Sequence, residues 1–360
     1  MIFSRSILSH QTHKADNLDY LRDIKPLFIL ATICFLYGIS AGAYIHSLNI
    51  FLSTLNLSNA QIDKIQSIDI LGGLVISPFV MFVVYKLGLY NLIILSLLLR
   101  TAGLVILVLV SSYELLCFGM FCFGVGGFVL YVCIFHWVNC IAINNVRATF
   151  ISVAITTFGL GISMGPMILV FLKIDVGMII KLSIITSLLI FFPLKSLKTY
   201  EPTYTFYMDT KLSRFFIAAR IPIMCALASD FIFYAVKDFL PTFAMSHNYL
   251  QYQAYLLVGY FGLSGLFFCI PLGIILDKFN RIRILILLSL AIAVSVQLIP
   301  LVIDNLVFTL IIFLVLSTSI NGIIISLFSI LGDKFSGGNL ILATSIVHAA
   351  STIGSYSDLS

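Results

Sequence analysis

The residues able to do chemistry are few, and each stands alone inside a long apolar run. Asp230 and Arg220 share one such run, and Arg100 follows three leucines in another. A charged side chain is costly inside a bilayer and usually faces a polar cavity. Asp230 could therefore bind a cationic group or a proton, or it could form a structural ion pair with Arg220 or Lys237. For Arg100 the expectation is snorkelling to the membrane surface or a structural partner, and Asp69 is expected to reach water.

No motif of an enzyme, a metal site or an ATP-driven pump occurs in the sequence. G-x-S-x-G, H-E-x-x-H and G-x-x-x-x-G-K-[ST] are all missing, and each of these places the side chains that its chemistry needs at a fixed spacing. The seven cysteines are scattered without a C-x-x-C pair, so neither a zinc site nor a redox pair is indicated. The sequence therefore predicts a protein that is not an enzyme and that holds no cofactor and no metal.

The composition restricts the fold class. Hydrophobic residues make up 61% of the chain and charged residues 10%, against about 25% charged in an ordinary soluble domain. The net charge of +5 does not indicate nucleic-acid binding, because the bases lie in short loops. A membrane-spanning helix needs about 20 apolar residues, which predicts an all-α polytopic membrane protein with about 11 spans. These are 26–51, 65–85, 89–110, 114–138, 148–172, 177–195, 214–236, 249–276, 283–302, 306–329 and 338–356.

The basic residues predict the orientation and the division of the chain. If the N-terminus lies inside, most of the 20 Lys and Arg residues fall in cytoplasmic loops, as the positive-inside rule requires. The segment 26–51 is too long for a signal-peptide core, so it is read as a retained first helix. The longest polar interruption, 196–213, separates an N-terminal bundle of six helices (26–195) from a C-terminal bundle (214–360). Residues 1–25 form a cytoplasmic segment before them.

A short basic turn joins two of the apolar segments and carries the most specific pattern. Gly273 precedes the turn, Asp277 and Lys278 begin it, and Arg281 and Arg283 end it. Glycine lets a second helix approach closely, and bases hold a loop in the cytoplasm. The layout resembles the signature loop of the major facilitator superfamily and is most similar to the bacterial YcaD-like branch. The resemblance implies that this loop gates the conformational change and does not contact the substrate.

A second pattern lies in the fifth apolar segment. Gly161 and Gly165 form a G-x-x-x-G face, and Pro166 follows. Such a face permits close helix packing, and proline bends a helix. The Gly-Pro pair resembles a signature of the proton antiporters of the superfamily, and a purely structural role is the alternative.

Several positions match or depart from the family pattern. Trp137 and Asn139 match the end of the fourth helix in the branch, whereas Phe135 stands where the branch has Glu. In the first half, Tyr85 stands where the family has Asp, and Met81 where it has Gly. The first-half copy of the loop pattern is therefore degraded. The fourth-helix Arg of the superfamily, often linked to proton coupling, would fall near Met120, and this loss and the one at Phe135 weigh against family-style proton coupling. Trp137 itself is expected to anchor its helix at the membrane interface.

The resemblance covers residues 26–357 and implies a fold of two pseudo-symmetric six-helix bundles around a midplane site. The chain stops in its eleventh segment, so the last helix is expected to be missing through truncation. In this family the first and seventh helices line the central cavity. Tyr37, Tyr44, Asp230 and Arg220 are therefore the candidate residues for binding a substrate or a proton.

The implied function is secondary active transport of a small solute by alternating access, with coupling to protons left open. The expected setting is a multi-pass monomer in a bacterial inner membrane, with its N-terminus in the cytoplasm. Its partners are a small-molecule substrate and the lipid bilayer. Two alternatives stay open: a non-transporting membrane receptor or interaction protein, and a decayed, truncated transporter.

Overall fold

The computed structural model describes residues 3–55, 57–142, 144–172, 176–202 and 212–355, and these residues form helices and short loops without a strand. The N-terminal half consists of α1 (Phe3–Ser53), α2 (Asn59–Ile76), α3 (Val80–Leu87), α4 (Leu89–Leu109), α5 (Tyr113–Ile141), α6 (Arg147–Leu172), α7 (Val176–Leu189) and α8 (Phe191–Leu197). The C-terminal half consists of α9 (Leu212–Ser246), α10 (Gln251–Ser264), α11 (Leu266–Lys278), α12 (Arg281–Val302), α13 (Leu306–Lys334) and α14 (Gly337–Gly354).

Local sequence explains where several helices begin and break. Asn280 accepts hydrogen bonds from the first backbone N–H groups of α12, and Asn305 does the same for α13, because a short polar side chain satisfies donors that a helix start leaves free. The turn Ser77–Phe79 contains a proline and separates α2 from α3. Both helices nevertheless belong to one apolar stretch, Asn59–Leu87.

Among the described residues, ten stretches of helix are long and apolar enough to cross a membrane. Each falls on one of the predicted segments. The predicted eleventh segment, 338–356, forms α14, which is not among the ten because polar residues such as Asn339 and His348 dilute it. The expectation of an all-α polytopic membrane protein is confirmed. The predicted linker lies largely at 203–211, outside the described residues, so the domain boundary stays a prediction.

The helices group into two sets that touch along a central seam. In the N-terminal half α1 packs on α6 and α7, and α5 lies between α2 and α4. In the C-terminal half α9 packs on α14 and α13. Across the seam α11 and α13 contact α6, and α14 contacts α5 and α3. One apolar core cluster contains residues from both halves.

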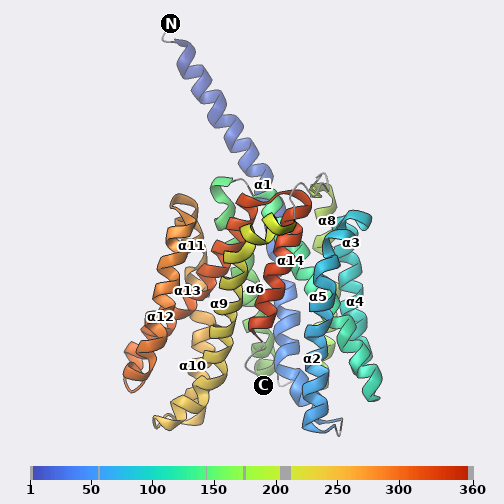
Figure 1. Ribbon diagram of the computed structural model, residues 1–360. Coiled ribbons are helices and arrows are strands. Elements are labelled where there is room, and N and C mark those ends of the chain that lie inside the picture. The colour runs from blue at the N-terminus through green and yellow to red at the C-terminus, as the bar shows by residue number, and fades with distance from the viewer. Residues whose placement is uncertain (1–2, 56, 143, 173–175, 203–211, 356–360) are drawn as a thin grey trace.

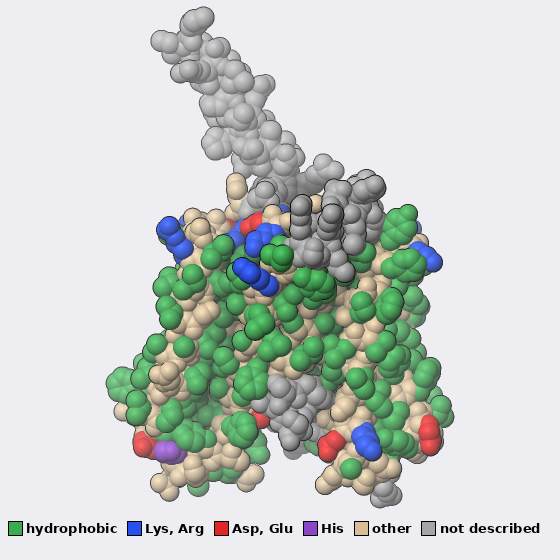
Figure 2. Space-filling view, in the orientation of Figure 1, with side chains coloured by type: hydrophobic (Ala, Val, Ile, Leu, Met, Phe, Trp, Pro, Cys, Tyr) green, Lys and Arg blue, Asp and Glu red, His purple; other side chains and the backbone are tan. Residues whose placement is uncertain are grey.

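The two ends of the bundle differ. The first part of α1 projects beyond one end, which we name the N-terminal face; α11 and α13 end there, and α6 and α14 begin there. Toward the opposite face the helices of the two halves spread apart, as α12 and α10 on one side and α2 and α4 on the other show (Figure 1). Apolar side chains cover the flank between the two ends, and charged side chains gather at both ends (Figure 2). This distribution suits a bilayer around the flank.

Glycines allow a close contact between α1 and α6. A Cβ atom on Gly42 would lie 2.0 Å from the Ile162 carbonyl oxygen, and one on Gly161 would lie 2.3 Å from the Phe35 carbonyl oxygen. A Cβ on Gly165 would come within 2.4 Å of the Ala43 nitrogen. Gly161 and Gly165 therefore lie in the contact between the two helices. The side chain of Pro166 is outside the described part of the structure.

Candidate functional site

At the N-terminal face, Asp277 at the end of α11 caps the start of α6. Its two carboxylate oxygens accept hydrogen bonds from the backbone N–H groups of Ala148 and Thr149, both at 2.8 Å, and from the Thr149 hydroxyl at 2.7 Å. The Asp277 side chain is only 5% exposed. The first N–H groups of a helix lack intrahelical acceptors and carry the positive end of its dipole. One carboxylate of the C-terminal half thus holds a helix of the N-terminal half.

Two arginines extend this contact into a network across four helices. Arg281 at the start of α12 donates to Asp277 at 3.1 Å and also forms an ion pair with Asp333 at the end of α13. Arg147, the first residue of α6, binds the same Asp333 at 2.8 Å. Both arginines are nearly buried, whereas the Asp333 side chain is 42% exposed. We name Asp277, Arg281, Asp333 and Arg147 the face cluster.

The structure places the five predicted loop residues in two different settings. A Cβ atom on Gly273 would lie 2.4 Å from the Ser152 hydroxyl and 2.8 Å from the Ala148 carbonyl oxygen, so Gly273 is where α11 touches α6. Asp277 and Arg281 belong to the face cluster. Lys278 and Arg283 are exposed, and within the described chain their side chains form no ion pair. Three of the five residues therefore join the halves, and two are surface bases.

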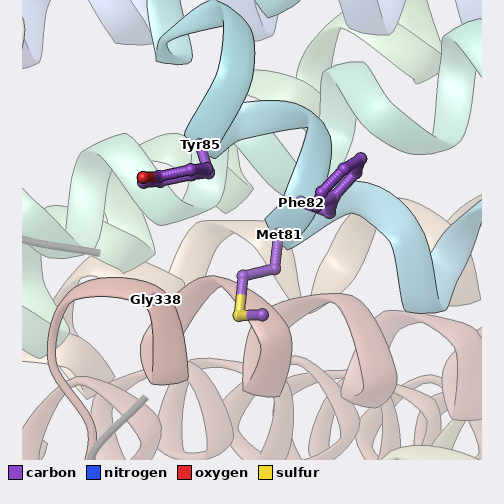
Figure 3. A pocket seen from close by; sticks show the side chains of 4 residues that line it. All are labelled: Met81, Phe82, Tyr85 and Gly338. Atoms are coloured by element: carbon purple, nitrogen blue, oxygen red, sulfur yellow. The ribbon is translucent and has the colours of Figure 1, made fainter. Parts of the chain in front are cut away.

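The matching position of the first half has a different chemistry. Tyr85 and Met81 on α3 lie beside Gly338 at the start of α14, and with Phe82 they line a pocket of about 180 Å³ (Figure 3). Ser336 directly precedes α14, but its side chain accepts no hydrogen bond from the first N–H groups of that helix. The Tyr85 side chain is 64% exposed. The position that carries an acid in the C-terminal half thus carries a tyrosine in the N-terminal half.

In the middle of the bundle, Asp230 on α9 is partly buried. In the part of the chain that the structure describes, its carboxylate has no hydrogen-bond or ion-pair partner. Arg220 is exposed and lies ten residues earlier, about 15 Å along the helix, and the Lys237 ammonium lies 5.2 Å above the Tyr234 ring. The alternative of a structural ion pair with Arg220 or Lys237 is therefore wrong.

A row of stacked rings joins the two halves. The His348 ring of α14 stacks on Tyr131 of α5, with ring centroids 4.0 Å apart, and on Phe128 at 4.7 Å. Nearer the N-terminal face, Phe135 of α5 stacks on Phe328 of α13 at 5.0 Å. We name Phe128, Tyr131 and His348 the aromatic floor. The sequence interpretation missed His348, although an ionisable residue inside an apolar segment is itself a signal.

A second polar group lies within the N-terminal half, around Arg100 of α4. This side chain is only 3% exposed, donates to the Ser40 hydroxyl at 3.3 Å, and lies 4.2 Å from the Phe123 ring centroid and 4.9 Å from that of Tyr37. A Cβ on Gly127 would touch its guanidinium at 3.0 Å. Arg100 has inward partners, so of the two expectations, snorkelling and a structural partner, the structure shows the second.

Tyr37 and Tyr44 of α1 face this group and do not stack on each other. The Tyr37 hydroxyl donates to the Gly127 carbonyl oxygen at 3.0 Å, and its ring packs on Phe158. The Tyr44 hydroxyl lies 3.4 Å from the Asp69 carboxylate, and its ring packs on Phe123 at 4.1 Å.

Trp137, near the end of α5, is fully buried. A side chain without exposed surface cannot sit among lipid headgroups, so the expectation of an interfacial anchor is wrong. It neighbours His136 and Asn139 in the chain, and a Cβ on Gly332 of α13 would lie 2.4 Å from the Asn139 side-chain oxygen. The end of α5 therefore packs tightly beneath the face cluster.

Two helical halves that meet through buried charges at one membrane face, with polar groups between them at mid-depth, define a polytopic solute transporter. The chain belongs to the Major Facilitator Superfamily, whose family model matches residues 29–356. This membership agrees with the expectation that the protein is not an enzyme. A relative described as the uncharacterized MFS-type transporter YfkF of Bacillus subtilis (strain 168) is 25% identical over 274 residues, which cover 73% of this chain and 69% of the relative.

Solved structures show the same fold at low identity. The fucose:proton symporter FucP of E. coli aligns with a TM-score of 0.68 and 16% identity, covering 92% of this chain and 90% of FucP. The proton:xylose symporter XylE aligns with a TM-score of 0.73 and 14% identity, covering 93% and 86%. The human organic anion transporter MFSD10 aligns with a TM-score of 0.72 and 10% identity, covering 92% of both chains. The implied superfamily fold is confirmed.

Proposed function

We propose that this chain is a secondary active transporter that moves a small solute across a bilayer by alternating access to one central site. The observation that carries the proposal is the cap that Asp277 places on α6, because a buried carboxylate of one half holds a helix of the other half. At the opposite face the helices of the two halves spread apart (Figure 1). Rocking of the halves would break the face cluster at one end and close the other end.

The orientation belongs to the same proposal. With the N-terminal face in the cytoplasm, Lys278 and Arg283 keep the α11–α12 loop on the side that the positive-inside rule assigns to bases. The face cluster is then a cytoplasmic gate, closed in this structure. A multi-pass monomer in a bacterial inner membrane, close to the YcaD-like branch, fits these features.

Coupling to protons is the finer part of the proposal. FucP is a fucose:proton symporter and XylE a proton:xylose symporter. In this chain Asp230 is the mid-depth carboxylate without a partner among the described residues, so it is the group that would hold a proton or a cation.

The test begins with ligand binding. The purified protein is unfolded by heat against a panel of metabolites and drugs, because a ligand that binds only the folded state raises the unfolding midpoint by mass action. A compound that raises the midpoint is then tested for counterflow in proteoliposomes. We expect counterflow in the wild type and a marked loss in Asp277→Asn.

The rival function is a membrane receptor that binds a ligand without moving it. The specific observation in its favour is the first-half position, where Tyr85 and Met81 stand beside the start of α14 in place of the acid and the glycine of the family pattern (Figure 3). Ligand binding without counterflow would assign the protein to this class and would contradict the proposal.

A further inference from the structure

The end of α5 holds a buried polar side chain that the closed N-terminal face leaves without a partner. Asn139 is only 2% exposed, and within the described residues neither its amide oxygen nor its amide nitrogen makes a hydrogen bond. A buried amide without partners costs free energy that an apolar side chain of the same shape does not. Packing alone therefore does not account for an asparagine at this position.

The side chain of Arg147, at the start of α6, has the complementary deficit. Its Nη1 atom donates to Asp333 at 2.8 Å, whereas its Nε atom is buried and has no acceptor in the described part of the chain. Arg147 as a whole is 8% exposed. One unpaired donor and one unpaired acceptor thus lie at the end of α5 and the start of α6, in the same half of the protein.

Gly332 of α13 lies against both of these groups. A Cβ atom on Gly332 would lie 2.4 Å from the Asn139 side-chain oxygen and 2.9 Å from the Arg147 Nε atom. The two atoms border the same point, so they are no farther apart than two hydrogen-bond lengths laid end to end. The next residue of α13 is Asp333, which binds Arg147. A single segment of the C-terminal half therefore contacts Asn139 and also supplies the carboxylate for Arg147.

Opening of the N-terminal face would take this carboxylate away. Arg147 is the member of the face cluster that belongs to the N-terminal half, so Asp277, Arg281 and Asp333 move together with the C-terminal half. A nearly buried guanidinium that loses its carboxylate is strongly destabilised. Asn139 stays beside Arg147 when the halves part, because both belong to the N-terminal half, and its oxygen can then accept the Nε–H group.

We infer that Asn139 is a positioning residue of the transport cycle: it accepts a hydrogen bond from Arg147 when the N-terminal face opens and gives Arg147 back to Asp333 when the face closes. The inference rests on the proposed function and adds the open-state partner of Arg147. The exchange keeps the guanidinium bound in both states, which lowers the free-energy cost of opening. Arg281 needs no such substitute, because Asp277 and Asp333 travel with it.

The open population can be measured through the reactivity of one cysteine. Ser152→Cys, in a background without the seven native cysteines, places a thiol at a fully buried position of α6 against Gly273. A water-soluble methanethiosulfonate reagent reaches this thiol only when the halves part, so the labelling rate rises with the open fraction. Asp277→Asn is the positive control, because it removes the charge that caps α6.

Two variants of Asn139 should shift the labelling rate in opposite directions. Asn139→Leu removes the acceptor at nearly constant size and should slow labelling at least about threefold; Asn139→Ala makes the same deletion if leucine does not fit. Asn139→Asp offers Arg147 a charged acceptor within its own half and should speed labelling at least about tenfold.

Thr101→Val is the matched control. The Thr101 hydroxyl on α4 is also buried without a hydrogen-bond partner among the described residues, but α4 packs mainly on α5 and α7 of its own half. Its removal should leave the labelling rate at the wild-type value, because it touches neither Arg147 nor the contact between the halves.

The outcomes separate the inference from the proposed function. A labelling rate in Asn139→Leu or Asn139→Ala at or above the wild-type rate, with the unfolding midpoint retained, overturns the inference whether or not Asn139→Asp folds. Slower labelling in Asn139→Asp also overturns it, because packing alone would then explain the asparagine. In either case faster labelling in Asp277→Asn leaves the proposed function standing. If Asp277→Asn is not labelled faster either, the halves do not part at this face, and the proposed function fails as well.

Discussion

Replacing Asp277 by Asn should open the N-terminal face. The substitution preserves the size of the side chain and removes its charge. The asparagine oxygen can still accept one or two hydrogen bonds, but its NH₂ group must face donors of α6 or Arg281. The perturbation therefore acts on the contact between the halves and leaves the interior of each half unchanged.

The size of the effect follows from the bonds that Asp277 makes. A hydrogen bond to a charged group contributes about 1.5–3 kcal/mol, against about 0.5–1.5 kcal/mol for a neutral one. The lost interaction with the helix dipole adds up to about 1 kcal/mol. Two weakened bonds and the dipole give about 2–4 kcal/mol. The ratio of closed to open molecules at the N-terminal face should fall about 30- to 700-fold.

The assay measures a distance across the seam. Spin labels on Lys86→Cys in α3 and Lys278→Cys in α11, in a background without the seven native cysteines, report the separation of the halves by pulsed electron paramagnetic resonance. Both positions are exposed. In Asp277→Asn we expect a second, longer distance that dominates the distribution.

The control removes a carboxylate at the opposite face. Asp304 is 78% exposed and pairs with His247 at 2.9 Å within the C-terminal half. Asp304→Asn should leave the distance between residues 86 and 278 unchanged. The reasoning is refuted if Asp277→Asn keeps the wild-type distribution while its unfolding midpoint shows a folded protein.

Three further predictions concern packing and buried charge. Gly42→Ala should lower the unfolding midpoint by several degrees, because its Cβ would lie 2.0 Å from a carbonyl oxygen, whereas Gly259→Ala should leave it unchanged, because nothing lies within 4 Å. The charges of Arg100 and Asp69 attract each other inside the N-terminal half, so Arg100→Gln and Asp69→Asn should each destabilise the fold. The double variant should cost less than the sum, since removing both charges leaves neither uncompensated; additive midpoint shifts would contradict coupling. Tyr85→Asp should cap α14 and favour the closed N-terminal face about tenfold. The spin labels should then show a larger share of molecules at the shorter distance.

Hydropathy predicted the helices because the lipid interior offers the backbone no hydrogen-bond partners. Each polar group of the main chain needs a partner inside the bilayer, so an apolar run of about 20 residues becomes a helix. Of the predicted segments, only α14 is too polar to count among the stretches that could cross a membrane. The loop pattern around Asp277 also pointed to a contact between helices, but its acceptor role could not be read from spacing, because the donors are backbone groups 128 and 129 residues away.

The surroundings of buried charges were beyond sequence reasoning. Arg100 turns inward because glycines on α5 leave room for it, and a Cβ on Gly126 would lie 2.5 Å from its backbone nitrogen. This fit between Arg100 on α4 and the glycines on α5 cannot be seen in the sequence of either helix alone. Asp230 was found from its charge, but its lack of an ion pair depends on the distant exposed position of Arg220. Whether a charge is paired is a property of the packed bundle.

The burial of Trp137 gives the protein an optical reporter of its own. The chain contains a single tryptophan, one helical turn before α5 ends beneath the face cluster, and its indole is shielded from solvent. Its fluorescence emission comes from this one place, without any label. When the halves part at the N-terminal face, water reaches the indole and the emission shifts to longer wavelength. Stopped-flow fluorescence on the unmodified protein would therefore time each opening directly.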